Sequence, residues 1–335
     1  MGHINIPIFI PHLGCPNQCI FCNQRFISGK IEFKESDVEQ QICEVLKTIK
    51  DDKPEIAFFG GSFTGIDQNL MIRLLDIAQK FITSGKVSAI RMSTRPDYIN
   101  PKIVDILKNY KISCVELGIQ SMNNDVLSYL KRGHTTDDTK NAIRLLKENN
   151  IPFVGQMMIG LPTATIQDEI ECAEFIARNG AQGARIYPTL VFKNTELENI
   201  TSKGLYVPLT CEEAISRSAT ALAVFVKANI PCIRIGLCES ENLHSDTTFV
   251  AGPNHPSIGE LVKSELYMRE ICVALRENSA KSVIIMCPSG ATSQVIGNKR
   301  KNISKLKEMY GFKQIKVIED KLLKPYNIKI INKED

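Results

Sequence analysis

Strand-like and helix-like stretches alternate through roughly the first 235 residues, and this rhythm is the strongest constraint on the fold. Seven apolar runs have strand character, at residues 4–10, 55–60, 88–94, 113–119, 152–159, 184–191 and 231–237. Six amphipathic stretches between them have helix character, at residues 37–50, 69–83, 101–109, 137–149, 166–179 and 211–228. Repeated strand–helix units predict an α/β fold with a parallel sheet, because parallel strands need a crossover that a helix usually supplies. The pattern leaves open whether this sheet is a full barrel, a partial barrel or flat.

The rhythm changes after residue 239. A stretch rich in Gly, Pro and His, VAGPNHPSIGELV, precedes a helix expected at 262–277. A strand (282–287), a helix (297–310) and two short strands (314–318 and 328–331) follow. We therefore divide the chain into a barrel domain at 1–238 and a small C-terminal α/β extension at 239–335 that closes the barrel, with no low-complexity linker between them.

The composition is ordinary for a soluble globular protein, with 43% hydrophobic and 23% charged residues. No apolar run reaches the ~18 residues of a membrane span, and no signal peptide is expected. The 11 cysteines are odd in number and scattered beyond residue 22, which argues against a disulfide framework and predicts a cytoplasmic location. The net charge of +4 is too small to predict nucleic-acid binding, and the basic cluster at 299–307 is typical of a solvated helix face.

Several predicted strands alternate polar and apolar residues, whereas strands buried on both faces usually read as continuous apolar runs. In CVELGIQ, Glu116 and Gln120 share one face, and ARIYP and CIRIGLC present Arg185 and Arg234 in the same way. With helices on the apolar faces, the polar faces line the barrel interior, which predicts a binding chamber. The alternative is a set of buried ion pairs that satisfy one another, such as Glu116 with an arginine.

Three cysteines, Cys15, Cys19 and Cys22, follow the first predicted strand in the spacing C-x3-C-x2-C. Thiolates bind soft or borderline metals, and zinc would need a fourth ligand that His12 could supply. A four-iron cluster held by three cysteines instead leaves one iron open to a substrate or cofactor. The cluster is favoured for three reasons: active-site loops of barrels follow the strands, the aromatic Phe21 precedes the last cysteine, and no second Cys or His pair lies nearby.

With an aromatic residue before its last cysteine, this motif resembles that of the radical S-adenosylmethionine superfamily. Other segments agree in order: FFGGSFTGI (58–66) resembles the family's Gly-Gly motif, MSTRPDYI (92–99) follows the third strand, and GQMMIGLP (155–162) comes later. VELGIQSMNNDVLSYLKRGH (115–134) resembles a stretch shared by oxygen-independent coproporphyrinogen oxidases and the catalytic subunit of Elongator. IRIGLCESENL and VAGPNHPSIGELV resemble the C-terminal extension of the Elongator-like branch. The resemblance implies a partial (β/α)6 barrel, a [4Fe-4S] cluster and S-adenosylmethionine.

The resemblance also implies roles for individual residues. Cys15, Cys19 and Cys22 would hold the cluster, whose open iron would bind the amino and carboxylate groups of S-adenosylmethionine. An external donor such as flavodoxin or ferredoxin would supply one electron. The residues that match the family's cofactor-binding positions are Phe21, Gly60, Gly61, Ser62, Ser93, Gln120, Arg132, Gln156, Ile159 and Leu161.

Within this set, Gln120 and Arg132 match positions that hold the ribose and the carboxylate, and an Arg fork suits a carboxylate. Ile159 and Leu161 would flank the adenine. Gln156 stands where relatives often have an acidic residue, which leaves that ribose contact open.

The substrate is the least constrained part of the reading. Elongator-like enzymes act on tRNA and carry an acetyltransferase domain, for which the residues after Cys238 are too few. A short, freestanding member is expected to act on a small molecule, with no membrane or nucleic-acid partner. Such a chain is similar to the queuine lyases, which cleave the C–N bond of queuine and release 7-aminomethyl-7-deazaguanine. The alternatives are a tRNA-modifying Elongator-like enzyme with residues 299–307 as its footprint, a coproporphyrinogen-oxidase-like enzyme, and a non-catalytic zinc-stabilised barrel.

Queuine makes chemical demands on a site: its base edge needs a carboxylate, its ring an aromatic partner, and its diol further polar groups. Besides Glu116, the carboxylate could come from Glu239 or Asp246. His255 could equally be a loop histidine that bonds to the backbone. The residues predicted to line the substrate site are Phe59, Phe63, Glu116, Arg185, Tyr187, Arg234, Cys238, Asn254 and His255.

Overall fold

The computed structural model describes residues 4–10, 13, 15, 19–23, 33–49, 53–237, 247–276 and 280–333. His12, Cys238, Glu239 and Asp246 lie outside the described residues.

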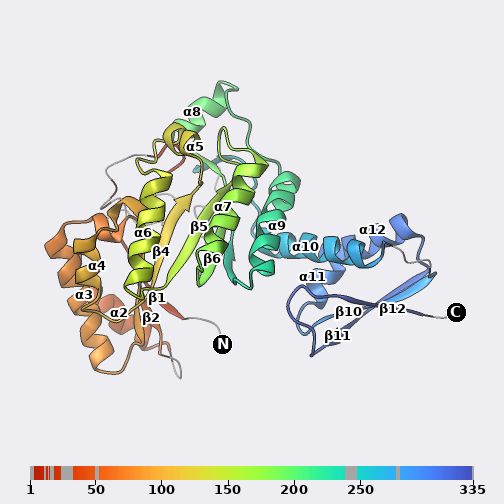
Figure 1. Cartoon of the computed structure of the whole chain (residues 1–335), viewed down its shortest axis with the longest axis horizontal. Coiled ribbons are helices and arrows are strands. Elements are labelled where there is room, and N and C mark those ends of the chain that lie inside the picture. The colour runs from red at the N-terminus through yellow and green to blue at the C-terminus, as the bar shows by residue number, and fades with distance from the viewer. Residues whose placement is uncertain are drawn as a thin grey trace.

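Seven parallel strands form one curled sheet and lie side by side in their order along the chain (Figure 1). They are β1 (Asn5–Phe9), β2 (Glu55–Phe59), β3 (Ala89–Thr94), β4 (Ile112–Gln120), β5 (Phe153–Ile159), β6 (Gly183–Pro188) and β8 (Cys232–Ile235). Since β1 and β8 are the two edges of the sheet, the barrel is partial, which confirms the expected fold class.

Amphipathic helices cover the outer face of this sheet. They are α2 (Val38–Leu46), α3 (Gln68–Thr83), α4 (Pro101–Leu107), α6 (Thr136–Glu148), α7 (Ile166–Arg178) and α9 (Cys211–Lys227). Thr135, Thr165 and Thr210 begin three of these helices with capping boxes, in which the threonine and the acidic residue three positions later satisfy free backbone N–H groups reciprocally.

Several short elements were not predicted from the sequence. Two are helices, α5 (Asn124–Tyr129) and α8 (Glu196–Ser202), and two are strands that pair with each other, β7 (Val191–Phe192) and β9 (Phe249–Ala251). The 3-10 turns are η1 (Glu35–Asp37), η2 (Phe63–Gly65), η3 (Pro96–Tyr98) and η4 (Asn298–Arg300). α5, α8 and the β7–β9 pair all lie in connections that follow the carboxyl ends of barrel strands, where they shape the mouth of the barrel.

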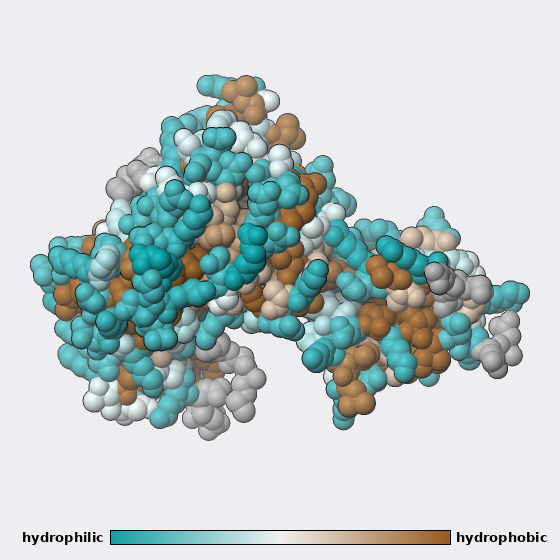
Figure 2. Space-filling model, in the orientation of Figure 1, coloured by the Kyte–Doolittle hydropathy of each residue, from teal (hydrophilic) through white to brown (hydrophobic). Residues whose placement is uncertain are grey.

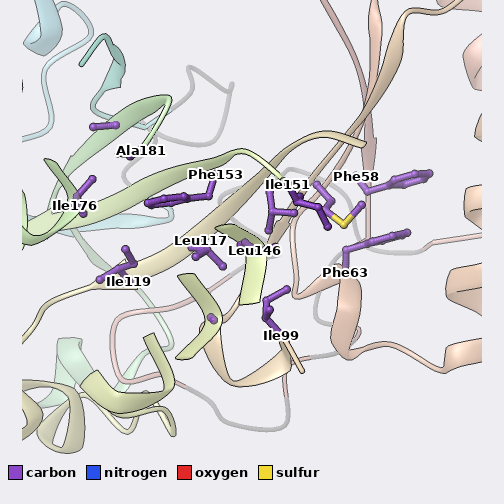
Figure 3. Packing of buried hydrophobic residues seen from close by; sticks show 14 of the residues in the cluster. Phe58, Phe63, Ile99, Leu117, Ile119, Leu146, Ile151, Phe153, Ile176 and Ala181 are labelled. Carbon is purple, nitrogen blue, oxygen red and sulfur yellow. The ribbon is translucent and has the colours of Figure 1, made fainter. Parts of the chain in front are cut away.

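The main hydrophobic core lies between the sheet and its helices. On β4, Val115, Leu117 and Ile119 face the helices and are fully buried, as their alternation with polar residues predicts. Figure 3 shows Leu117 and Ile119 packed in this core near Leu146 of α6 and Phe153 of β5. Each such side chain stabilises the fold by roughly 1.5–3 kcal/mol, which fixes the opposite face of every strand toward the barrel interior.

The C-terminal extension is a second, smaller α/β unit. It contains α10 (Ile258–Ala274), β10 (Ser282–Pro288), α11 (Thr292–Ile296), α12 (Lys301–Tyr310), β11 (Gln314–Asp320) and β12 (Lys329–Asn332). Its sheet has the order β11-β10-β12, in which β10 is parallel to β11 and antiparallel to β12.

Helix α10 joins the two parts and belongs to both cores. Val262 and Leu266 pack into the barrel core, whereas Ile271, five residues later, packs into the core of the extension. Arg269 also bonds from α10 to Ser216 and Thr220 of α9. The three described strands β10, β11 and β12 pair with one another, and their sheet stands beside the barrel (Figure 1), whereas β9, which also follows residue 238, pairs with β7 at the mouth of the barrel.

The hydropathy of the surface differs between the barrel and the extension. Figure 2 shows hydrophilic side chains over the barrel helices and brown, apolar surface gathered on the extension. Among the described residues, no helix combines the length and hydropathy that crossing a bilayer requires.

Candidate functional site at the mouth of the half-barrel

The cysteine loop after β1 is held against segments from far along the chain. The backbone N–H of Ile20 donates to the carbonyl of Leu130 (3.1 Å), and the carbonyl of Ile20 accepts from the N–H of Leu197 (2.8 Å). A small apolar cluster surrounds this anchor, with Phe21 and Tyr187 at its margin. Its buried members are Ile20, Val126, Leu130, Met158, Leu161, Val191 and Leu197. The loop is therefore fixed at the carboxyl end of the sheet, beside apolar surface that excludes water.

The cysteines contact residues that were predicted to bind the cofactor. Sγ of Cys15 lies 3.5 Å from Oγ of Ser62, and Sγ of Cys19 accepts from Nη1 of Arg132 at 3.4 Å. The backbone N–H of Cys22 donates to the carbonyl of Cys19. In the described part of the chain, no three Cys, His, Asp or Glu side chains lie close enough to share a metal ion. The contacts thus place Cys15 and Cys19 beside predicted cofactor-binding residues, but they do not bring the three thiols within metal-sharing distance of one another.

Arg132 reaches the cysteines because β4 carries a glycine. Its Nη2 donates to the carbonyl of Gly118 (2.9 Å), and a Cβ on that glycine would lie only 2.7 Å from the same nitrogen. Beside it, Nε2 of Gln156 on β5 donates to Oε1 of Gln120 on β4 (3.4 Å). Cys19, Arg132, Gln120 and Gln156 therefore form one polar group across two strands and the cysteine loop.

Arg95 belongs to the site, although it was not predicted from the sequence. It is 1% exposed, donates two bonds to Asp97 (2.9 and 2.8 Å) and lies over the ring of Tyr98. Burial lowers the pKa of Arg95, but Asp97 and the thiol groups of Cys19 and Cys15 outweigh it and raise that pKa above its ordinary value. The available signal was the Arg-x-Asp directly after a barrel strand, in MSTRPDYI.

His134 was also missed and is 3% exposed. Its Nε2 lies 3.3 Å from the carbonyl of Ile119, which assigns the proton to that nitrogen in the neutral ring. Burial, with Arg132 and Arg95 nearby, lowers the pKa of His134 to about 3, so the imidazole is uncharged near neutral pH.

Within the part of the chain that the structure describes, three buried polar atoms of this group have no hydrogen-bond partner: Nη1 of Arg95, Nε of Arg132 and Nδ1 of His134. Unpaired buried donors are costly, so free guanidinium N–H groups beside sulfur atoms indicate a place for an anion. An iron–sulfur cluster on thiolates and the carboxylate of S-adenosylmethionine are anions of this kind. The residues present therefore fit both groups.

Two predicted side chains lie elsewhere. Side chains alternate along β5, so Ile159, three residues after the lumen-facing Gln156, points to the opposite face and belongs to the core on the helix side. Met158 shares the face of Gln156 and lies in the apolar cluster with Leu161 at the mouth. Phe63 was expected to stack on a substrate, but its ring packs on Phe58 in the core, with centroids 4.4 Å apart (Figure 3). Neither Ile159 nor Phe63 is available to a ligand.

The glycines after β2 meet the chain's own backbone. A Cβ on Gly61 would collide with the carbonyl oxygen of Leu13, and Gly60 has φ +107°. These glycines therefore let the β2 loop lie against the segment that leads into the cysteines, which also places Ser62 beside Cys15.

Deeper in the lumen, charged residues pair with one another. Oε1 of Glu116 accepts from Nη1 of Arg91 (3.2 Å) and Nη2 of Arg185 (2.8 Å), while Nε of Arg91 donates to Glu55 (2.8 Å). Arg185 also bonds to the hydroxyl of Tyr187. For Glu116 the structure thus has the ion-pair alternative rather than a free carboxylate.

The remaining predicted substrate residues surround this network or lie at the edge. Phe59 lies under the guanidinium of Arg185, 5.8 Å from it, and Ser93 is half-buried on β3. Arg234 is exposed on the edge strand β8. Asn254 and His255 line a small cavity against the carboxyl ends of β6 and β8, and Nδ1 of His255 accepts from the N–H of Ser257, as the backbone-bonded alternative predicts.

Comparison with known proteins decides the family. Residues 9–176 match the Radical SAM superfamily, and residues 181–268 match the Radical_SAM C-terminal domain. The chain belongs to the radical SAM superfamily. It is thus a radical SAM enzyme that uses a [4Fe-4S] cluster and S-adenosylmethionine.

Its relatives include Elongator-like proteins, as expected. The chain is 30% identical over 226 residues to an uncharacterized protein of Methanocaldococcus jannaschii, covering 63% of this chain and 68% of that one. It is 28% identical over 252 residues to a tRNA uridine(34) acetyltransferase of Methanocaldococcus infernus, covering 68% of this chain but 46% of the relative. The structure of the archaeal M. infernus Elp3 with an N-terminal deletion shares the fold, with a TM-score of 0.63 and 24% identity over 80% of this chain and 63% of that one.

The chain thus spans about half the length of the named tRNA-modifying relative. The relatives give no support to a queuine lyase, and the expectation that nucleic acid is not a partner loses its support, because that relative's name places it on tRNA.

Proposed function

We propose that this radical SAM enzyme modifies a base within tRNA by abstracting hydrogen at the mouth of its half-barrel. The observation that carries the proposal is the group of Cys19, Arg132 and Arg95, in a chain whose relatives include a tRNA uridine(34) acetyltransferase. Acetyl transfer forms no part of the proposal, because this chain matches less than half of that relative.

When bound, the cluster and S-adenosylmethionine supply one electron and a carbon radical that can abstract hydrogen. Cys15, Cys19 and Cys22 would hold the cluster. The unpaired N–H groups of Arg132 and Arg95 would bind the cofactor carboxylate and balance the negative charge of the thiolates.

Other residues of this chain would orient the cofactor and exclude water. Gln120 and Gln156 present amide groups suited to ribose hydroxyls. Phe21, Met158 and Leu161 supply apolar surface for the adenine. Holding the reacting carbon near one substrate hydrogen is the main contribution that such a site can make.

The test compares deoxyadenosine release by the anaerobically reconstituted enzyme with unmodified tRNA transcripts, with free queuine and with neither. Release should rise above background with a tRNA. Cys19→Ala should abolish release, whereas Cys43→Ala, at an exposed cysteine on α2, should leave it unchanged. No rise with any tRNA would reject the proposal, and a rise with queuine alone would restore the lyase.

A further inference from the structure

The C-terminal extension differs sharply in charge from the rest of the chain. Residues 280–335, the part of the extension after α10, contain twelve Lys and Arg against five Asp and Glu, a net charge of +7, while the whole chain has +4. The residues that precede this segment therefore sum to −3. Such a charge asymmetry is typical of a segment that binds a polyanion, and the net charge of the whole chain does not reveal it.

Four basic side chains at one end of this unit are exposed and pair with no acidic side chain of the described residues. Lys299, Arg300, Lys301 and Lys305 follow one another through the loop after α11 and the first turns of α12. Among the described residues, no ion pair involves any of these four. Their charges are thus available to a ligand, whereas several surface charges of the barrel are paired along their own helices.

The loop between α11 and α12 is held in place from inside. Nδ2 of the buried Asn302 lies within hydrogen-bonding distance of carbonyl oxygens of Ser264, Gln294 and Val295, which ties α12 to α10 and α11. A Cβ on Gly297 would lie 2.8 Å from Cγ of this asparagine. The loop therefore presents its basic side chains from a fixed backbone, which lowers the entropy lost on binding.

The arrangement has a known use. In this unit β10 is followed by two helices, α11 and α12, which are joined by a tight loop that begins with glycine, and then by β11. The strands form one three-stranded sheet with helices packed on it. This arrangement resembles the general form of KH-type modules. In those modules a Gly-x-x-Gly loop clamps the backbone of about four nucleotides. Here Gly297 begins the loop, and Arg300, with φ +63°, stands at the position of the second glycine.

We propose that the C-terminal extension is an RNA-docking unit whose loop at Gly297–Arg300 holds the phosphate backbone of a single-stranded RNA segment. The inference rests on the proposed function only for the choice of tRNA as the natural ligand. The sheet and helix arrangement favours RNA over other polyanions, which the test separates.

Binding of the full-length holoenzyme to labelled single-stranded RNA and to a tRNA transcript, measured by anisotropy at several salt concentrations, tests this. Each phosphate contact on a single strand contributes about 0.7 to the slope of log affinity against log salt. Lys299→Ser with Arg300→Ser should lower the slope by about 1.4, which corresponds to roughly 25-fold weaker binding at about 0.1 M salt.

Two further variants control for a general effect of positive charge and for a loss of stability. Lys86→Ser with Lys147→Ser removes the same charge from exposed positions on the barrel that have no ion-pair partner among the described residues, and it should leave binding unchanged. Arg300→Gly suits the positive φ and should bind about 5-fold more weakly without a lower melting temperature. Unchanged binding in the loop variants, equal loss in the barrel control, or equal competition by heparin and single-stranded DNA would each overturn the proposal.

The outcomes also separate this inference from the proposed function. RNA binding through the loop without tRNA-stimulated deoxyadenosine release would reject the function and leave the docking unit. Equal stimulation by tRNA in the parent and the loop double variant would reject the docking unit and leave the function.

Discussion

Replacing Glu116 by Gln should separate a structural role in the lumen from a role in reading a substrate. Glu116 is 3% exposed, and a single oxygen, Oε1, accepts from both Arg91 and Arg185. With Glu55 the network holds two positive and two negative side chains. Glutamine keeps the shape and one acceptor oxygen but leaves a buried positive charge without its counter-ion.

The magnitude follows from the two distances. At 2.8 and 3.2 Å, with an effective dielectric constant of about 20, each pair attracts by about 5–6 kcal/mol. Much of this is offset because a neutral Gln costs less to bury, so a net loss of about 3–5 kcal/mol is expected, as for other buried pairs broken on one side. For a domain at the upper end of the usual size range, this corresponds to a melting temperature lower by roughly 6–10 °C.

Thermal and urea unfolding measure the effect, with Glu174→Gln as control at an exposed site on α7, where less than about 0.5 kcal/mol is expected. Adding Arg185→Met to Glu116→Gln removes the excess charge and should recover part of the loss, giving a favourable coupling in the double-mutant cycle. A Glu116→Gln variant as stable as its parent, with weaker substrate binding instead, would show that the carboxylate faces a ligand.

Three other substitutions probe the mouth of the barrel. Gly118→Ala should push Arg132 from its place, because the added Cβ would lie 2.7 Å from Nη2, and S-adenosylmethionine binding measured by equilibrium dialysis should weaken roughly tenfold; unchanged affinity would remove Arg132 from the cofactor site. The pKa of His134 falls from 6.5 in the unfolded chain to about 3 in the fold, so the unfolded state binds the extra proton. The contribution of the buried neutral His134 to the free energy of unfolding should be full above about pH 6.5 and should decline as the pH falls toward 3. In urea unfolding of the cluster-free chain, His134→Gln should make this decline less steep. An equally steep decline in the variant would contradict the inference that burial lowers the pKa of His134. Glu169→Ala breaks a buried pair with Arg217 (2.6 Å) and should cost about 3–5 kcal/mol in the same assay, whereas a cost below about 1 kcal/mol would mean that this pair does not support the fold.

Much of the barrel could be predicted because the residues of each strand alternate between polar side chains that face the lumen and apolar side chains that face the helices. CVELGIQ alternates strictly, so the faces of Glu116 and Leu117 followed from period two alone. The same rule could have excluded Ile159, which cannot share a face with Gln156. Phe63 lies beyond the strand, where periodicity gives no direction, and only the 3-10 turn at Phe63–Gly65 brings its ring back to Phe58.

Other parts depend on tertiary contacts that no local pattern records. α5 has six residues, too few for a periodic signal, yet the carbonyl of its Leu127 accepts from the backbone N–H of Arg132. Arg95 lies in MSTRPDYI, where only the order of segments pointed to the family, and its importance appears only when the fold brings it near Cys15 and Cys19. The whole-chain charge concealed the basic part of the extension in the same way, because a sum over 335 residues cannot show that residues 280–335 alone carry +7.

The relation between the two parts bears on the size of the substrate. α10 packs in both hydrophobic cores, so the extension cannot turn freely without exposing Leu266 or Ile271 to water. A fixed basic unit beside the barrel would add nothing to the binding of a free base held in the lumen, but under the proposal it would add phosphate contacts for a polymer long enough to reach both places. Since Glu116 is already occupied by Arg91 and Arg185, the lumen offers a free base less specificity than the sequence suggested. Both observations favour a polynucleotide whose target base enters the mouth while its backbone rests on the extension.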